Sequence, residues 1–279
     1  MKMRQILITF LVVSLITTAI CFFVFYAPRR TGMGTRTSFC PDTGSAVTNA
    51  KTAEETVEED DLLPEDLDTI LVNEQTVPLD TIPSSLTVLV NRDYLLSSSY
   101  IPAHLVEPKV RFSFDYKSER RMMRKDAARA LEKMFRDAKK KKNVILYGVS
   151  AYRSYQRQRE IYLRNVALRG RSATDVVSAT PGSSEHQTGL TIDISAKSVD
   201  CALIPAFGNT KEGRWVAKNA HKYGYIVRYP AGKTKVTGYH YEPWHIRYVG
   251  ITTATYLYKN NLTLEEYYGI QDITHKRKV

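Results

Sequence analysis

The segment from Ser183 to Asp193, which reads SSEHQTGLTID, constrains the fold more than any other part of the chain. It places the imidazole of His186 seven residues before the carboxylate of Asp193, with Gly189 between them. From residue 190 onward apolar and polar side chains alternate, which is the period-two pattern of a half-buried strand. Because glycine tolerates positive φ, the backbone can turn sharply at Gly189 and bring both side chains to one point. The segment therefore predicts a loop and a strand that present two potential metal ligands.

A second alternating segment, from Trp244 to Tyr248, supplies a third potential ligand, His245. Two imidazoles and one carboxylate are a ligand set that zinc accepts, and they leave a fourth position for water. Glu242 precedes His245 by three residues and is a suitable general base for that water. The chain has no HExxH helix, so a thermolysin-type site is not expected. Each residue alone could be structural, as a core histidine, a capping aspartate or a strand histidine, and only the combination favours metallopeptidase chemistry.

The spacing of apolar residues predicts an α+β domain in the second half of the chain. Helices are expected over residues 118–142, 155–169, 172–179 and 211–223 and from residue 252, and strands over 144–149, 190–195, 225–229 and 244–249. Ser118 and Ser154 are expected to cap the first two helices. Arg153 would then lie at a junction between a strand and a helix, where its side chain could reach into a cleft.

The helix expected over residues 118–142 carries much of the chain's net charge of +11 on one face. This face could simply be solvated, or it could attract a polyanionic surface such as a membrane or an acidic cell-wall polymer. Nucleic acid is not expected as a partner, because the chain contains no RRM, zinc-finger or helix-turn-helix signature.

The N-terminal part of the chain contains an uncharged, strongly apolar run over residues 6–27. This run is long enough to cross a hydrocarbon core as a helix, and a cleaved signal peptide is the alternative. An acidic, weakly apolar stretch follows over residues 28–85 and predicts a flexible spacer. Three scattered cysteines indicate no metal site or disulfide framework, although a Cys40–Cys201 bridge could form in an oxidising compartment.

Three blocks of this sequence resemble the VanY-type D-alanyl-D-alanine carboxypeptidase family, zinc peptidases of the lysostaphin and Hedgehog fold group. The first is Tyr152-Arg153-Ser154-Tyr155-x-x-Gln158, and the second is Ser184-x-His186-x-x-Gly189-x-x-x-Asp193. The third runs from Glu242 through Trp244-His245-x-Arg247-Tyr248-Val249-Gly250. Thr191 stands where the family usually has alanine, a small-residue exchange that leaves the ligands unchanged. The resemblance spans roughly residues 86–259.

The resemblance implies a Hedgehog/D-Ala-D-Ala-peptidase-like fold, with a central antiparallel sheet packed by helices. His186, Asp193 and His245 would bind Zn²⁺, Glu242 would be the catalytic base, and Arg153 would contact the peptide's terminal carboxylate or the carbonyl under attack. Ser184 and Gln158 would hold the substrate. His240 could stabilise the reaction intermediate or be a nearby surface histidine.

We therefore expect a zinc-dependent D-alanyl-D-alanine carboxypeptidase in which an activated water removes the terminal D-alanine of peptidoglycan stem peptides. The expected organisation is a cytoplasmic N-terminus (1–5), a single-pass membrane anchor (6–27), an extracytoplasmic spacer (28–85), the peptidase domain (86–260) and a C-terminal tail (261–279). Alternatives are an L,D-carboxypeptidase acting on tetrapeptides, a cell-wall endopeptidase, and a non-catalytic module that keeps zinc for wall binding.

Overall fold

The structure is a computed structural model that describes residues 77–273, apart from the side chains of residues 176 and 177. The predicted membrane anchor over residues 6–27 and most of the predicted spacer lie outside this range. Between residues 77 and 273, no helix combines the length and apolar character needed to cross a bilayer.

The centre of the fold is a four-stranded sheet with the strand order β3-β4-β6-β5. Its members are β3 (Tyr147–Ser150), β4 (Thr191–Ser195), β6 (Glu242–Tyr248) and β5 (Tyr225–Tyr229). Every neighbouring pair is antiparallel, which confirms the expected sheet. Two further strands, β1 (Leu105–Val106) and β2 (Met123–Arg124), form a separate two-stranded sheet.

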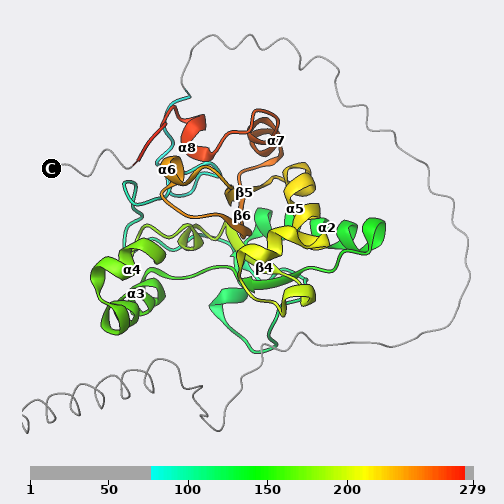
Figure 1. Ribbon diagram of the computed structural model, residues 1–279, viewed down its shortest axis with the longest axis horizontal. Helices are drawn as coiled ribbons and strands as arrows, with labels where there is room; N and C mark the ends of the chain where they lie inside the picture. Colours follow the sequence, from blue (N-terminus) through cyan, green and yellow to red (C-terminus); the bar gives the residue numbers. More distant parts are fainter. Residues whose placement is uncertain (1–76, 274–279) are drawn as a thin grey trace, which may run out of the picture. The chain divides into compact units, whose positions relative to one another are not determined.

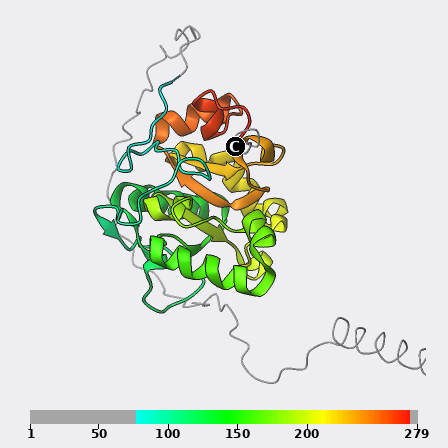
Figure 2. The ribbon, with the colours of Figure 1, turned by 90° about the vertical axis from the view of Figure 1, so that its left-hand side faces the viewer.

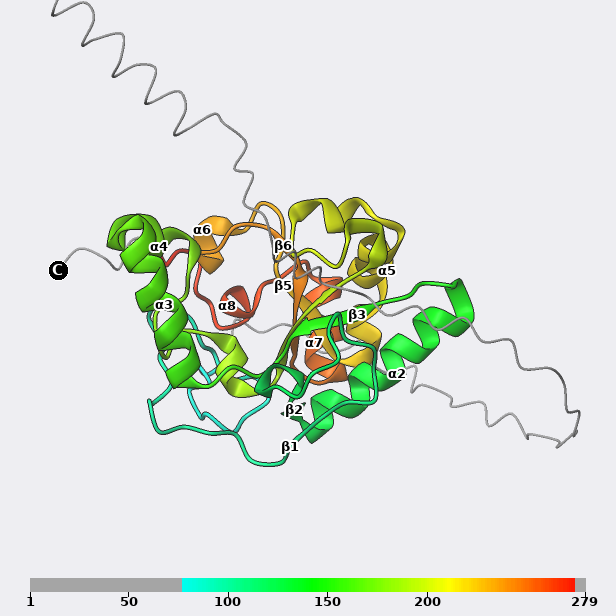
Figure 3. The ribbon, with the colours of Figure 1, turned by 90° about the horizontal axis from the view of Figure 1, so that it is seen from below.

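The main hydrophobic core lies against one face of the sheet. Ile192 of β4 and Ile246 of β6 are fully buried there, together with Leu131 and Met134 of α2 (Lys125–Lys142). The helix α5 (Lys211–Asn219) and the 3-10 turn Ala220–Tyr223 contribute to the same core. Figure 3 shows α2 on one side of the strands and α3 on the other. Alternation along β4 and β6 therefore sends apolar side chains to α2 and polar ones to the opposite face.

The remaining helices gather in two groups with the strands between them (Figures 1 and 2). The first group comprises α3 (Tyr155–Arg169), which Ser154 caps as predicted by accepting from the Arg157 amide, and α4 (Arg171–Val177). The second comprises α7 (Ile251–Lys259) and α8 (Leu264–Tyr267), and the short α6 (Thr234–Thr237) lies in the loop before β6. Further 3-10 turns cover Glu119–Arg121, Glu185–Thr188, Lys197–Val199 and Pro205–Asn209.

The first predicted helix is wrong over its first seven residues. Ser118 caps only the 3-10 turn Glu119–Arg121, and α2 begins at Lys125. Between them β2 pairs with β1, and the Arg124 amide donates to the carbonyl of Gly189 at 2.8 Å. Pairing with distant segments thus overrides the local helical spacing, as tertiary contacts commonly do.

The C-terminal segment that was expected to be a tail from residue 261 is packed into the domain as far as residue 273. Thr263 forms a capping box with Glu266 at the start of α8, and Leu264 is fully buried against Leu257 of α7. Helix α8 also delivers a buried carboxylate, Glu265, toward the sheet. The ordered domain therefore extends beyond the boundary expected at residue 260.

Candidate metal centre

A tight turn before β4 places the first ligand candidate. His186 lies in the 3-10 turn Glu185–Thr188, and Gly189 ends this turn with a φ of 68°, as the sequence predicted. Any side chain at this glycine would be strained, and a Cβ atom would lie 3.0 Å from Cδ2 of Leu105. The glycine therefore permits both the reversal of the chain and its close approach to β1.

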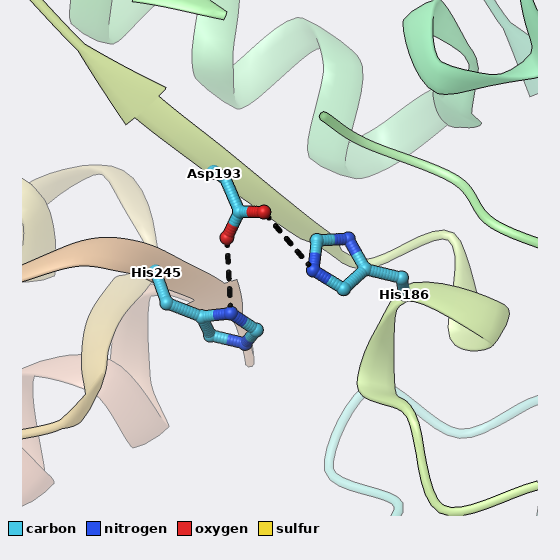
Figure 4. A group of neighbouring side chains, drawn as sticks. All are labelled: His186, Asp193 and His245. Carbon is cyan, nitrogen blue, oxygen red and sulfur yellow. Dashed lines mark hydrogen bonds and ion pairs between the residues drawn. The ribbon is translucent and has the colours of Figure 1, made fainter. Parts of the chain in front are cut away.

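The three predicted ligands converge at the sheet, as Figure 4 shows. Asp193 on β4 and His245 on β6 are direct partners across the two strands. Asp193 Oδ2 lies 3.3 Å from His186 Nε2, and Asp193 Oδ1 lies 3.1 Å from His245 Nδ1. One donor atom from each residue lies within 4.8 Å of the other two, and all three side chains are buried. The structure thus brings together residues that are separated by up to 59 positions in the sequence.

Hydrogen bonds orient the two imidazoles differently. His186 Nδ1 donates to the carbonyl of Ala151 at 2.7 Å, which requires a proton on Nδ1 and leaves the lone pair of Nε2 for the site. His245 presents Nδ1 to Asp193, while its Nε2 points away toward Glu185 Oε2 at 3.5 Å. The site would therefore use Nε2 of one histidine and Nδ1 of the other.

The electrostatic balance of the cluster favours a cation. Burial raises the pKa of Asp193, but His186 and His245 more than compensate, so the carboxylate is held ionised. Burial and the Arg153 charge lower the pKa of His186. Burial would also lower the pKa of His245, yet the hydrogen bond to Asp193, the nearby Glu185 carboxylate and the charges of Asp193 and Glu242 raise it to about 9. In the metal-free protein at neutral pH, the His245 ring is therefore the imidazolium, with a proton on each nitrogen.

These donors fit a zinc ion. An imidazole Nε2, an imidazole Nδ1 and a carboxylate oxygen are zinc ligands in proteins, and three protein ligands leave a position open for water. The His186 ring is fixed by the Ala151 carbonyl in the tautomer that a metal requires. The geometry therefore supports the predicted ligand set of His186, Asp193 and His245.

Glu242 lies at the edge of this cluster, where a general base would be needed. Its Oε2 is 3.6 Å from His245 Nδ1, and its side chain is 28% exposed, so it can reach both the ligands and the solvent. Burial and the charge of Asp193 raise its pKa to about 7, against the opposing effects of His245 and Arg153. A carboxylate with a pKa near the working pH can both accept and return a proton.

A cavity of about 240 Å³ opens over the cluster, and it contains the predicted substrate residues Arg153, Gln158 and Ser184. Arg153 Nη1 donates to Gln158 Oε1 at 2.9 Å, while Gln158 Nε2 donates to the Ala179 carbonyl at 2.6 Å. Gln158 is 2% exposed. Its amide is therefore occupied on both sides and orients the Arg153 guanidinium toward the cavity. Ser184 is buried at the cavity wall.

His240, the remaining histidine that the sequence singled out near the third block, is exposed and does not line the cavity. Two cavity residues that sequence reasoning did not assign are Tyr229 and Tyr239, whose rings stack with centroids 4.4 Å apart. Tyr229 also lies against the His245 ring, with centroids 4.8 Å apart. Tyr239 lies in an aromatic-rich stretch before β6 and Tyr229 ends β5, and in the sequence both positions are as typical of packing as of binding.

Sequence reasoning also missed a buried network of charges behind the metal ligands. Glu185 pairs with Arg228 of β5 and Arg247 of β6, and Arg228 pairs with Glu265 of α8. Burial opposes ionisation of Glu185, but the two guanidiniums prevail and hold its pKa well below the ordinary value. Glu185 is adjacent to His186 in the sequence, whereas nothing in the sequence connects Glu265 to the site.

Comparisons with known proteins show which family this chain is similar to. The profile of the VanY family, described as D-alanyl-D-alanine carboxypeptidase, matches residues 120–251. The putative carboxypeptidase YodJ of Bacillus subtilis (strain 168) is 50% identical over 192 residues, which cover 68% of this chain and 70% of that protein.

Two solved structures extend the similarity to three dimensions. The LdcB LD-carboxypeptidase is 49% identical, with a TM-score of 0.65 over 67% of this chain and 87% of its own. The vancomycin-resistance D,D-pentapeptidase VanY, solved in complex with Zn(II), is 34% identical, with a TM-score of 0.54 over 65% of this chain and 98% of its own. Because it shares both sequence and fold with these proteins, this chain belongs to the VanY family of D-alanyl-D-alanine carboxypeptidases.

Proposed function

We propose that this protein is a zinc-dependent carboxypeptidase that releases the C-terminal D-alanine from peptidoglycan stem peptides. The observation that carries the proposal is the convergence of His186, Asp193 and His245 beside Glu242, beneath a cavity that contains Arg153. Zinc held by the three ligands would polarise the scissile carbonyl and make a water more acidic. Peptidoglycan is proposed as the substrate because the LdcB structure is described as revealing peptidoglycan recognition.

Arg153 suits the recognition of a C-terminal carboxylate. A carboxypeptidase must bind an anionic terminus, and the planar guanidinium fork matches a carboxylate in two parallel hydrogen bonds. Its hydrogen bond to Gln158 fixes the plane of the guanidinium before the substrate arrives, which reduces the entropic cost of binding. Ser184, at the wall of the same cavity, is proposed to hold the peptide backbone.

Glu242 is proposed to move the proton in the reaction. Its carboxylate accepts a proton from the attacking water at Oε2 and returns it to the leaving amine of the terminal D-alanine. In the metal-free protein its pKa is raised to about 7, which suits a carboxylate that accepts and returns a proton. Arg153 also lies near enough to influence the charge of Glu242, so it could stabilise negative charge that develops on the carbonyl oxygen.

Two substrates fit the same machinery. A D,D-carboxypeptidase removes D-alanine from a pentapeptide that ends in D-Ala-D-Ala, as the family description implies. An L,D-carboxypeptidase removes D-alanine from a tetrapeptide, and the 49% identity to the LdcB LD-carboxypeptidase favours this second activity. The two differ in the length of the stem and in the residue before the scissile bond, which is D-alanine in the first and an L-configured residue in the second, so the cavity walls must make the choice.

The decisive experiment incubates the full chain, loaded with zinc, with defined penta- and tetrapeptide stems side by side. Mass spectrometry of the products should show loss of one alanine from at least one stem, and a D-amino-acid assay should identify the product. The His186→Ala variant should release none. Cleavage inside the stem would assign an endopeptidase instead, and zinc binding without turnover of any stem would assign a binding module.

We further propose that residues 6–27 anchor the chain in the cell membrane, with the catalytic domain outside the cytoplasm. The support is the length and apolar character of this segment. A reporter that is active only outside the cytoplasm should be active when it is fused behind residue 85. Deletion of residues 1–27 should remove the protein from the membrane fraction. Inactivity of the reporter, or an unchanged membrane fraction, would refute the anchor.

The exposed basic face of α2 is proposed to attract anionic wall polymers. Its exposed cations are Lys125, Arg129, Lys133, Arg136 and Lys139 to Lys142. Binding of the protein to purified anionic wall polymer should weaken as salt rises, because exposed charges are screened. Reversal of Arg129 and Lys133 to glutamate should weaken it further, and unchanged binding would refute the assignment.

A further inference from the structure

One ring nitrogen of His245, Nε2, is not accounted for by the three proposed ligands. Its Nδ1 faces Asp193 and would bind the metal, so its Nε2 must carry the proton. That Nε2 is buried and has no partner at ordinary hydrogen-bond distance among the described residues. The carboxylate that faces it is Glu185, whose Oε2 lies 3.5 Å away. His186 has no such deficit, because the Ala151 carbonyl accepts from its Nδ1.

Glu185 is buried and is hydrogen-bonded to two arginines on the side away from His245. It is 1% exposed, and its Oε1 accepts from Arg228 Nε at 2.8 Å and from Arg247 Nη1 at 2.7 Å. Both arginines are themselves fully buried and anchored. Arg228 makes two further bonds, of 2.7 and 2.6 Å, to Glu265, and Arg247 Nη2 donates to the Leu86 and Val88 carbonyls.

This arrangement uses one oxygen of Glu185 and directs the other at the metal site. Oε1 accepts from two guanidinium groups, whereas among residues 77–273 the polar groups that face Oε2 are His245 Nε2 and the hydroxyl of Thr191, each at 3.5 Å. A carboxylate in this position favours the tautomer with the proton on Nε2 and makes Nδ1 a better donor to a metal. The two buried arginines both donate to Oε1, so that Oε2 is the oxygen that faces His245.

We propose that Glu185 is a positioning residue for His245, and that its Oε2 accepts the Nε2 proton so that the Nδ1 lone pair is directed at the metal. The inference rests on the proposed zinc site. The Arg228–Glu265 pair supports Glu185 from α8 without touching a ligand.

The Glu185→Gln variant tests this role because it replaces the acceptor that faces His245 Nε2 with a donor. The amide oxygen must keep accepting from Arg228 and Arg247, so the amide nitrogen would face His245 Nε2 and place a donor against a donor. The wrong tautomer of His245 would then be favoured. We expect zinc to bind about 10- to 100-fold more weakly, as measured by competition with a chromophoric chelator. The visible spectrum of the Co²⁺-substituted protein should also change.

Glu265→Gln is the matched control, because it removes a buried carboxylate from the same network but not from His245. Glu265→Gln should lower the Tm. Its zinc Kd should stay within about twofold of the wild-type value, and its Co²⁺ spectrum should be unshifted. Should Glu185→Gln fail to fold, Glu185→Asp keeps the charge that the arginines need but withdraws the carboxylate from Nε2. This variant should also weaken zinc binding.

Two results would overturn the role of Glu185 without affecting the proposed function. In the first, both Glu185 variants bind zinc within about twofold of the wild type. In the second, Glu265→Gln weakens zinc binding as much as Glu185→Gln does. Failure of the wild-type protein to bind zinc would instead refute the proposed function, together with everything that depends on it. Because the readouts are metal affinity and spectrum rather than turnover, the two failures are distinguishable.

Discussion

Replacement of Glu242 by glutamine should abolish most of the turnover while zinc binding is retained. Glutamine has nearly the same shape as glutamate, but it cannot accept a proton. Glu242 is not among the three convergent ligands, and its Oε2 lies 3.6 Å from His245 Nδ1, close enough to share a water with the metal site.

The size of the effect follows from the role. General-base catalysis contributes about 10²- to 10⁴-fold, which corresponds to about 2.7–5.4 kcal/mol in the activation free energy. In the wild type the base is the ionised carboxylate, so activity should rise as pH increases through the pKa of Glu242, which is about 7 in the metal-free protein. A bound divalent cation favours the charged form and would move this acid limb lower.

Steady-state kinetics on the stem peptide that the wild type cleaves would measure the loss, with zinc content determined on the same samples. The expected result is a fall in kcat of at least about 10²-fold, a KM within a few-fold of the wild type, and disappearance of the acid limb. A Glu242→Gln protein that binds zinc and turns over within tenfold of the wild type would refute the assignment of this base.

Four further outcomes are expected. Arg153→Lys should lower kcat/KM by about 10- to 100-fold, because a charged hydrogen bond worth about 1.5–3 kcal/mol is lost. On a substrate with an amidated C-terminus, the wild type and the variant should have similar kcat/KM values. Because the pKa of His245 is raised to about 9, zinc must displace a proton below that pH. Calorimetry should therefore show proton release near pH 7 and a zinc affinity that rises about tenfold per pH unit toward 9; a pH-independent affinity would contradict this. Met134→Ala, at a fully buried position of α2, should cost about 2–5 kcal/mol of unfolding free energy in denaturant titration. Gly189→Ala should destabilise by about 1–2 kcal/mol, because alanine at a φ of 68° is strained, and an unchanged Tm would refute the conformational argument.

The strands that carry Asp193 and His245, and the two faces of each strand, could be predicted from sequence because period-two alternation is a local property, whereas the antiparallel sheet was expected only from the family resemblance. The pattern around Ile192 and Ile246 places alternate side chains on opposite faces, and the structure confirms that these two lie in the core while Asp193 and His245 lie on the other side. Gly189 and the Ser154 cap were predictable for the same reason, since their backbone roles depend on nearest neighbours.

Where local preference competed with distant partners, the sequence was insufficient. The helix expected from Ser118 begins only at Lys125, because Met123 and Arg124 pair with β1. Residues 261–273 were expected to be a tail, yet Glu265 is fully buried against Arg228. Such pairings depend on contacts between segments that share no sequence pattern.

The sequence by itself determined which residues could bind zinc, because two imidazoles and a carboxylate are ligand types that zinc accepts. Only the tertiary structure decided how they are used. It assigned Nε2 to His186 and Nδ1 to His245, engaged Gln158 in orienting Arg153, and brought Glu185 and its buried arginines behind the site. The physical reason is that a hydrogen bond is decided by distance and direction in space, and separation along the chain sets neither.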